Sequence, residues 1–292
     1  MAKRGLILIP ILLFLFGVGI LLYPLLGAYW NQQHESEICL EYSVQAAEKA
    51  ENQQELVRQD LLSAQAYNRM LAQSVIYSDS QFKEHEQENS EYNDLLNVTD
   101  DGVMAYLEIP KIEVNLPIYH GADAETLEKG IGHLPETSLP IGGDSTHAVL
   151  SGHTGMKYAR LFTDLNQLCE GDYFYVHVYE ERLVYQVDQI KTVLPTNTAD
   201  LQVIAGEDHV TLMTCTPYGV NSHRLLVRGT RVLQPEKQAE SDGSATETHS
   251  ETKTVPTSST WMQEYWKSVI LGLRIAVGAV VVIAYLMMRR RG

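Results

Sequence analysis

The apolar residues of this chain form one long run near each end. The first run covers residues 6–26 and follows Lys3 and Arg4, and the second covers residues 268–288 and precedes three arginines. Each run has about the twenty residues that a helix needs to cross a bilayer. Because basic residues flank the outer end of each run, the positive-inside rule places both termini in the cytoplasm. The pattern therefore predicts a cell-membrane protein with two transmembrane helices in contact with membrane lipid and an extracellular body between them.

Each run also has an alternative interpretation. Residues 6–26 could be a cleaved signal peptide, although Leu26-Gly27-Ala28 is a weak processing site. The second run is interrupted by Arg274 and could form an amphipathic tail on the membrane surface. The anchor interpretation is favoured because Arg274 lies near the outer edge of the run, where its side chain could reach the headgroups.

A helical period follows the first apolar run. Residues 34–74 contain no proline or glycine, and Val57, Leu61, Ala64 and Leu71 are spaced by four, three and seven positions. This spacing places the four side chains on one face of an amphipathic helix. The segment predicts one or two helices with a face that docks against the next domain. The polar, mixed segment that follows is typical of a loop leading into a short helix.

Short β-rich runs fill the next part of the chain, from Gly102 to Leu233. Turn residues separate these runs, and Pro110 and Pro117 break the first of them. Many short strands at close spacing with little helix are typical of a closed barrel or a sandwich. Residues 234–260 contain almost no large apolar side chain, so they cannot bury a core and predict a disordered linker.

These patterns divide the chain into five parts. In order they are an N-terminal membrane segment (1–30), a helical extension (31–101), a mainly β domain (102–233), the linker (234–260) and a C-terminal membrane anchor (261–292). The net charge of −15 falls mostly on the body and the linker. This charge argues against a nucleic-acid partner, because such partners require a basic surface. No HExxH motif, CxxC pair or glycine-rich phosphate loop occurs, so no metal and no cofactor is expected.

The three cysteines differ in their surroundings. Cys39 and Cys169 could form a disulfide, or each could be a small buried apolar residue. Cys215 ends the alternating run HVTLMTC, which places Thr211, Met213 and Cys215 on one face of a strand. Its position at a strand end makes Cys215 the cysteine with an unusual context.

The residues after Cys215 predict a hairpin. Pro217 removes a ladder donor and ends the strand, and Gly219 and Asn221 favour a turn. The next strand would begin near Arg224, which the hairpin returns beside Cys215. A guanidinium favours the thiolate form of a neighbouring cysteine and stabilises an oxyanion during acyl transfer. Cys215 is therefore a candidate nucleophile, with Arg224 as its cationic partner.

An acyl-transferring cysteine also needs an acid that protonates the leaving amine, usually a histidine. Among the ten histidines, His153 is the favoured candidate because it ends the apolar run AVLSGH. His223 is the alternative, but it adjoins Arg224, and neighbours on a strand point to opposite faces. Three histidines lie in polar turns and are expected to be solvated: His120, His133 and His147.

Four longer segments carry a resemblance to a known family: YLEIPKIEVNLPIYHG, GIGHLPETSLPIGGDSTHAVLSGHTG, VDQIKTVLP and CTPYGVNSHRLLVRG. In this order they resemble the sortases, membrane-bound transpeptidases of Gram-positive bacteria, and among them the class C, pilus-assembling group. The resemblance covers residues 102–233 together with the helical extension and the two anchors. It implies an eight-stranded closed β-barrel with an α-helical N-terminal extension and two terminal transmembrane helices.

The same resemblance implies roles for particular residues. Cys215 would be the nucleophile, His153 the acid, and Arg224 the residue that binds the signal and steadies the oxyanion. Thr214 is expected among the substrate contacts. The implied partners are pilin subunits: an LPXTG-type sorting signal is cleaved between Thr and Gly, and the thioester-held fragment is joined to a lysine amine of another subunit.

Class C sortases usually carry a lid with an Asp-Pro-aromatic motif over the active site. The matching position here is Asp79-Ser80-Gln81-Phe82, which keeps the aspartate and the aromatic residue but lacks the proline. We therefore expect a lid near residues 77–84 that contains Asp79 and Phe82 and is less rigid than a proline would make it. An ordinary flexible connector is the alternative.

Other functions stay open on the sequence alone. A sortase that attaches surface proteins to cell-wall peptide would differ only in the accepting amine, which lies on the partner. A non-catalytic module that binds pilin is disfavoured by the joint presence of Cys215, His153 and Arg224. A cysteine protease that uses water would be disfavoured by a dry, lidded site.

Overall fold

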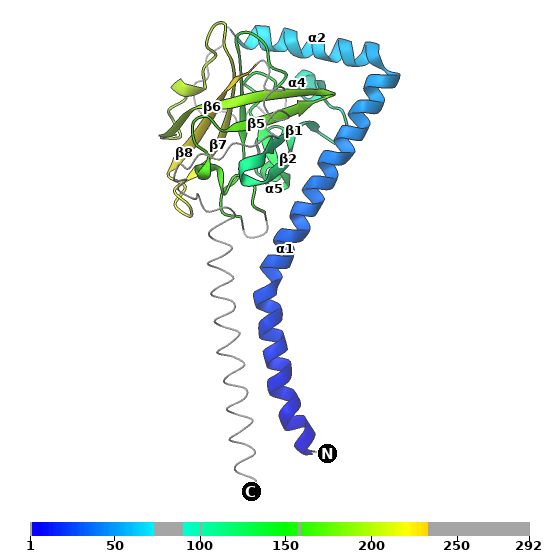
Figure 1. Ribbon diagram of the computed structural model, residues 1–292, viewed down its shortest axis with the longest axis vertical. Helices are drawn as coiled ribbons and strands as arrows, with labels where there is room; N and C mark the ends of the chain where they lie inside the picture. The colour runs from blue at the N-terminus through cyan, green and yellow to red at the C-terminus, as the bar shows by residue number, and fades with distance from the viewer. Residues whose placement is uncertain (1, 73–89, 100, 157–158, 233–292) are drawn as a thin grey trace, which may run out of the picture. The chain divides into compact units, whose positions relative to one another are not determined.

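The computed structural model describes residues 2–72, 90–99, 101–156 and 159–232 (Figure 1). The predicted linker and C-terminal anchor lie outside the described residues, and so do the expected lid residues Asp79 and Phe82.

The chain divides into two compact units, residues 1–27 with 244–292 and residues 28–243. The described residues of the first unit belong to helix α1 (Ala2–Asn52), which includes the first apolar run. Among the helices in the described part of the chain, none is both long enough and apolar enough to cross a bilayer. The two transmembrane helices therefore stay predictions.

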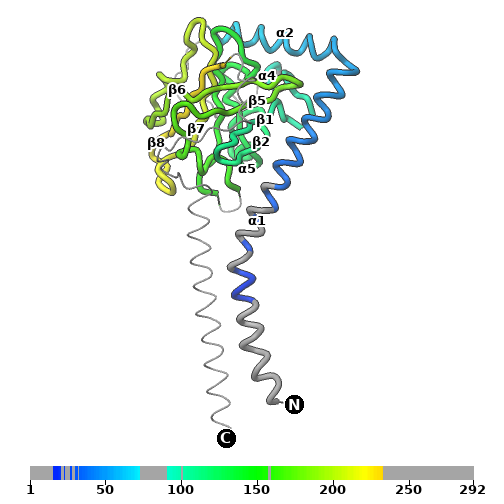
Figure 2. The backbone as a smooth tube through the Cα atoms, viewed as in Figure 1, coloured from blue at the N-terminus to red at the C-terminus, as the bar shows by residue number. Residues whose placement is uncertain are grey.

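The second unit contains a closed barrel of eight strands, which confirms the predicted mainly β fold (Figure 1). The hydrogen-bonded order around the barrel is β1-β2-β3-β4-β7-β8-β6-β5. The β2–β3 and β4–β7 pairs are parallel, and the other pairs are antiparallel. Figure 2 shows β7 beside β8 along their length. The strands are β1 (Val103–Ile109), β2 (Val114–His120), β3 (Ile131–His133), β4 (Thr146–Ser151), β5 (Tyr173–Val178), β6 (Glu181–Val193), β7 (Asp208–Thr216) and β8 (His223–Arg231).

Short helices join the strands of the barrel. They are α5 (Ala124–Lys129) and the 3-10 helices η1 (Pro110–Ile112), η2 (Leu165–Gln167) and η3 (Ala199–Leu201). Another short helix, α4 (Ser90–Asp94), precedes β1. Each is a turn or two long, so the strands carry most of the architecture and bring their ends together at the rims of the barrel.

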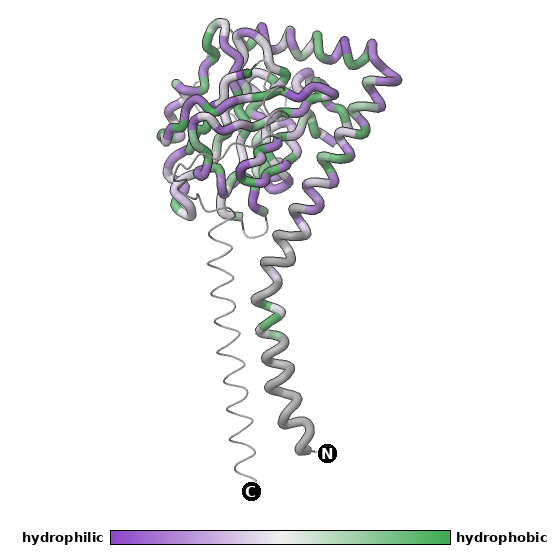
Figure 3. The backbone as a smooth tube through the Cα atoms, viewed as in Figure 1, coloured by the Kyte–Doolittle hydropathy of each residue, from purple (hydrophilic) through white to green (hydrophobic). Residues whose placement is uncertain are grey.

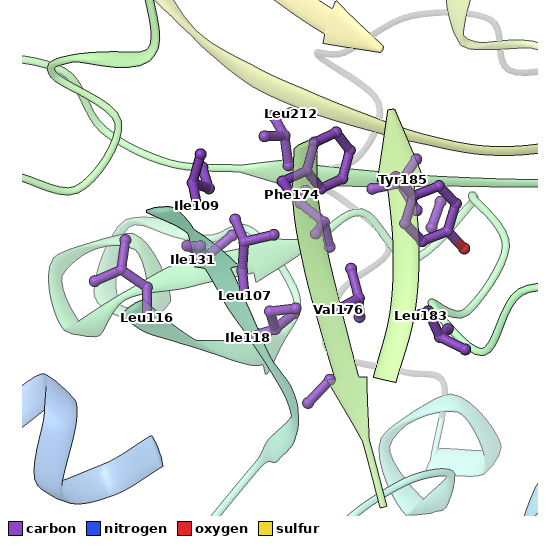
Figure 4. Packing of buried hydrophobic residues seen from close by; sticks show 14 of the residues in the cluster. Leu107, Ile109, Leu116, Ile118, Ile131, Phe174, Val176, Leu183, Tyr185 and Leu212 are labelled. Atoms are coloured by element: carbon purple, nitrogen blue, oxygen red, sulfur yellow. The ribbon is translucent and has the colours of Figure 1, made fainter. Parts of the chain in front are cut away.

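Alternate side chains of the strands fill the barrel. Successive residues of a strand point to opposite faces, so one residue in two enters the core. Figure 3 shows hydrophobic and hydrophilic stretches interspersed along the backbone of the barrel. In Figure 4, Leu212 of β7 lies next to Phe174 of β5, and Leu107 of β1 lies nearby in the same cluster. These three side chains are fully buried.

Pro117 lies inside β2, so the prediction that it breaks the first β-rich run is wrong. It pairs with Tyr106 of β1, and the β2–β3 ladder begins one residue later, at Ile118. Proline is tolerated at such a margin, where its missing N–H interrupts no ladder. Pro110 ends its run as predicted, because it begins η1 directly after β1.

Helix α2 (Gln54–Leu71) docks on the barrel through the predicted face. Ala64 is fully buried in the main core, and Leu61 and Leu71 pack against that core. A break at Gln53 separates α2 from α1, so the extension contains the two helices that the sequence allows.

Polar side chains of the extension add hydrogen bonds to the barrel. The hydroxyl of Tyr42 donates to the Met104 carbonyl and accepts from the Tyr179 N–H, each at 3.0 Å. Asp60 accepts from the Tyr179 hydroxyl and from the Leu96 N–H, the latter at 3.1 Å. Burial and the hydrogen bond to Asp60 raise the pKa of Tyr179 well above its usual value. Tyr179 therefore stays a neutral donor to the helical extension.

Asn68 ties α2 to the barrel through two hydrogen bonds to one residue. Its amide nitrogen donates to the Leu139 carbonyl at 3.1 Å, and its amide oxygen accepts from the Leu139 N–H at 2.7 Å. Both residues are buried. Asn68 thus satisfies both backbone groups of one loop residue, as a neighbouring strand would.

Asn68→Ala should lower the free energy of unfolding by about 1–3 kcal/mol, because it leaves the buried Leu139 N–H without a partner. The Leu139 carbonyl keeps its bond from the Ile141 N–H. Urea denaturation of the parent and the variant measures this loss. The matched control is Gln65→Ala, an exposed position on the same helix that should change stability by less than about 0.5 kcal/mol. Equal midpoints for the two variants would contradict the assignment of Asn68 as a tie.

Candidate active site

Cys215 and Arg224 lie opposite each other at one end of the β7–β8 hairpin. The antiparallel register pairs them directly, and the next pair, Thr216 with His223, closes the ladder. Directly paired residues share a face of the sheet and have Cβ atoms about 4.5–5.5 Å apart. Both side chains are half-buried. The predicted nucleophile and its predicted cationic partner are therefore neighbours.

The hairpin closes as the sequence predicts. The N–H groups of Val220 and Asn221 both donate to the Pro217 carbonyl at 3.0 Å. Gly219 and Asn221 have φ angles of 74° and 58°. Glycine and asparagine enter this left-handed region more readily than other residues, which explains why this pair of residues makes the turn.

The thiol lies on the outer face of the barrel. Val210 and Leu212 of β7 belong to the main core, whereas Met213 belongs to a separate cluster with Leu201 of η3. Cys215 follows Met213 by two residues and therefore shares its face. The segment between β6 and β7 covers this outer face beside Met213, and Cys215 lies where β7 ends.

His153 follows β4, and β4 runs parallel to β7. The last pair of this ladder is Ser151 with Met213, so His153 and Cys215 each follow that pair by two residues along their own segments. The contact continues past the end of β4, since the Gly152 N–H donates to the Met213 carbonyl at 3.1 Å. The ends of three adjacent strands, β4, β7 and β8, thus contribute the histidine, the cysteine and the arginine.

His223 is directed elsewhere. It shares its strand face with Leu225 and Val227, which are buried in the main core, and not with Arg224. Its Nδ1 is hydrogen bonded to the Ser222 hydroxyl at 2.9 Å. The geometry therefore favours His153 over His223 as the acid.

Arg228 is held outside this group of side chains. It pairs with Thr211, four residues along β8 from Arg224. Its Nε donates to Asp188 at 3.2 Å, and a second bond joins the same two side chains. Arg228 is thus engaged in an ion pair away from the thiol.

The expectation of solvated turn histidines is wrong for His133 and His147, which are buried, whereas His120 is half-buried. His133 has one ring nitrogen 2.9 Å from the Tyr92 hydroxyl and the other 2.8 Å from the Ser138 carbonyl. His147 donates from Nδ1 to the Gln202 carbonyl at 3.0 Å and accepts from a threonine hydroxyl of β7 at 2.7 Å. Burial lowers the pKa of His133 to about 3 and that of His147 to about 4. Both are neutral structural residues.

The other two cysteines are free. Cys39 is buried, as expected for a small apolar residue, and burial raises its pKa to about 12. Cys169 is exposed, contrary to the expectation of burial, because it lies in the turn before β5. Neither residue forms the disulfide that the sequence left open.

Thr214, which the sequence suggests as a substrate contact, has a buried side chain. Its side chain is 4% exposed, and its hydroxyl donates to the Gly152 carbonyl at 2.6 Å. Strand alternation directs it away from the face that carries Cys215. The sequence did not predict this hydrogen bond to Gly152, because the partner of a hydroxyl on a strand cannot be read from neighbouring residues.

Within the described residues, no group of three or more histidine, cysteine, aspartate or glutamate side chains is arranged to hold a metal ion. The expectation that the protein needs no cofactor stays a prediction. What the site offers is acyl-transfer chemistry: a thiol, a guanidinium that steadies negative charge, and an imidazole that can hold a proton.

Known proteins of one family resemble this chain in sequence and in fold. The Sortase domain profile matches residues 107–232. The crystal structure of sortase C-1 from Streptococcus pneumoniae is 44% identical, with a TM-score of 0.62, and the alignment covers 68% of this chain and 99% of that one. The chain belongs to the sortase family.

The solved sortases that resemble this one include further members of the C group. Sortase C-1 from Actinomyces oris is 49% identical with a TM-score of 0.56, over 61% of this chain and 99% of that chain. Among curated relatives, sortase D of Bacillus subtilis is 32% identical over 129 residues, which are 43% of this chain. The matches span 62% of that sortase and 59% of sortase A from Bacillus anthracis.

Proposed function

We propose that this sortase is a membrane-anchored cysteine transpeptidase that polymerises pilin subunits. The observation that carries the proposal is the strand register, which sets Cys215 opposite Arg224 and brings the end of β4, two residues before His153, beside β7. A thiol, a cation and a histidine at the ends of three adjacent strands suit acyl transfer better than simple binding.

The reaction follows from these three side chains. The Cys215 thiolate attacks the threonine carbonyl of an LPXTG-type sorting signal, and Arg224 steadies the oxyanion of the tetrahedral intermediate. When the intermediate collapses, His153 gives a proton to the departing glycine amine, and a thioester remains on Cys215. A lysine amine of a second pilin subunit then attacks the thioester and gives a proton to the neutral His153. The isopeptide bond forms, and Cys215 leaves as the thiolate that began the reaction.

Relatives support the pilin as substrate. A sortase C of Streptococcus pneumoniae, 39% identical with a TM-score of 0.60, is described in terms of catalysis and pilin substrate specificity. Another similar structure, 42% identical, is sortase C1 of a pilus island. The alternative, attachment of surface proteins to cell-wall peptide, requires the same chemistry with a different amine.

The two apolar runs of the sequence support a membrane location for the enzyme. We propose that residues 6–26 and 268–288 span the membrane, with both termini cytoplasmic and the barrel outside. An impermeant maleimide applied to intact cells should label the exposed Cys169. A cysteine introduced next to Gly292 should be labelled only after the cells are broken, and the reverse pattern would contradict this topology.

The function can be tested with the purified full-length chain in detergent. Incubation with an LPXTG peptide should add to the protein the mass of the peptide up to its threonine, as seen by mass spectrometry. A pilin peptide that bears a lysine should remove this adduct and yield a branched peptide. If only a peptide with a cell-wall amine removes the adduct, the enzyme anchors proteins to the wall. If no adduct forms, the transpeptidase proposal is wrong.

A further inference from the structure

We propose that Thr214 is a positioning residue for the acid His153, acting through the carbonyl group of Gly152. The inference rests on the proposed function, in which His153 protonates the leaving amine. It replaces direct substrate contact as the role of Thr214.

The Thr214 hydroxyl makes a hydrogen bond to β4's end of the chain just beyond the last backbone hydrogen bond between β4 and β7. β4 ends at Ser151, and the last backbone bond of this edge runs from the Gly152 N–H to the Met213 carbonyl at 3.1 Å. The Thr214 side chain then takes the next acceptor, the Gly152 carbonyl, at 2.6 Å. A buried hydroxyl therefore holds the peptide group that leads into His153.

Phe162 holds the same short segment from the other side. Its N–H donates to the His153 carbonyl at 3.1 Å, and its side chain is fully buried. A Cβ atom on Gly152 would lie 2.7 Å from the Phe162 ring, so only glycine fits there. The carbonyl groups of Gly152 and His153 are thus both fixed, one by Thr214 and one by Phe162.

This arrangement couples the acid to the nucleophile. Thr214 directly precedes Cys215, so its hydroxyl ties the backbone of His153 to the strand that carries the thiol. Displacement of a catalytic group by about 1 Å can cost on the order of a hundredfold in rate. Loss of the Thr214 hydroxyl should release the His153 segment on the side of Cys215 and impair proton delivery to the leaving group.

A change of leaving group isolates this effect. The amine that leaves an LPXTG peptide must be protonated, whereas the alkoxide that leaves an ester analogue depends less on the acid. Thr214→Val keeps the shape of the side chain and removes the hydroxyl. It should lower kcat for the peptide about ten- to a hundredfold, change KM little, and lower kcat for the ester analogue less than about threefold. Thr214→Ser, which retains the hydroxyl, should restore most of the peptide activity.

Thr211→Val is the matched control. Thr211 is a buried threonine of the same strand whose hydroxyl bonds to His147, on the far side of Met213 from the thiol. The Thr211→Val variant should have the same ratio of peptide rate to ester rate as the parent enzyme. Equal losses on both substrates with a raised KM for Thr214→Val would assign Thr214 to substrate contact and overturn the inference. Unchanged peptide turnover would overturn it as well.

A second pair of variants keeps the test decisive if Thr214→Val fails to fold. Gly152→Ala should collide with Phe162 and show the same selective loss on the peptide, and adding Phe162→Leu should recover part of it. A non-selective loss in Gly152→Ala would contradict the positioning role. Failure of the parent enzyme to form a thioester would refute the proposed function instead, so the two failures are distinguishable.

Discussion

Replacing Cys215 with alanine should abolish transpeptidation while leaving the barrel folded. No other described side chain near this strand end offers a thiol, so the variant has no group on which to hold the acyl fragment. Turnover of an LPXTG peptide should fall by at least about 10⁴-fold, the scale of loss when a covalent nucleophile is removed. The mass of the protein should stay unchanged after incubation with the peptide.

Cys169→Ala is the matched control, because Cys169 is the exposed free thiol away from the site. That variant should form the adduct and turn over peptide as the parent does. Thermal unfolding should place both variants close to the parent, since neither replacement opens a large cavity. Adduct formation that survives Cys215→Ala and disappears with Cys169→Ala would show that the nucleophile is misassigned.

Arg224→Lys should lower kcat/KM by about 10²–10³-fold, even though the positive charge is retained. A guanidinium offers a rigid fork of donors, whereas an ammonium is a compact point charge on a flexible stem. Loss of a donor aimed at a developing oxyanion costs about this much in acyl-transfer enzymes. Steady-state kinetics with the LPXTG peptide measures the effect.

Arg228→Lys provides the comparison on the same strand. Arg228 lies four positions from Arg224 and is paired with Asp188. Its replacement should change stability slightly and leave kcat/KM within about twofold, as for a partly exposed ion pair. If the two variants lost activity equally, the effect would arise from the net charge of the strand, and the specific role of Arg224 would be refuted.

Much of the β7–β8 hairpin could be predicted because its signals are local. The period-two pattern separates Cys215 from the core positions of β7, and Pro217 limits the length of the strand. Gly219 and Asn221 supply the positive φ angles of the turn. Each signal acts within a few residues, so the pairing of Cys215 with Arg224 follows without knowledge of the remaining chain.

Predictions failed where a distant partner determines the environment. His133 and His147 lie among turn residues in the sequence, but carbonyl and hydroxyl groups from other segments complete their hydrogen bonds inside the protein. Pro117 looked like a strand breaker because the margin of the β2–β3 ladder cannot be seen in the sequence. Cys169 looked like a buried residue for the same reason, since a turn residue and a core residue can have the same neighbours along the chain.

Local patterns along the chain were enough to predict the order of the β-rich runs, the hairpin that joins the thiol to the arginine, and the candidate acid at the end of another run. Only the closed barrel shows that β4, which leads into this acid, pairs in parallel with β7, which carries the thiol, although the two segments are about sixty residues apart in the chain. It also decided that Thr214 bonds to Gly152. The reason is physical: turns and alternation depend on neighbours along the chain, whereas the partner of a strand edge or of a buried hydroxyl depends on which segments the closed barrel brings together.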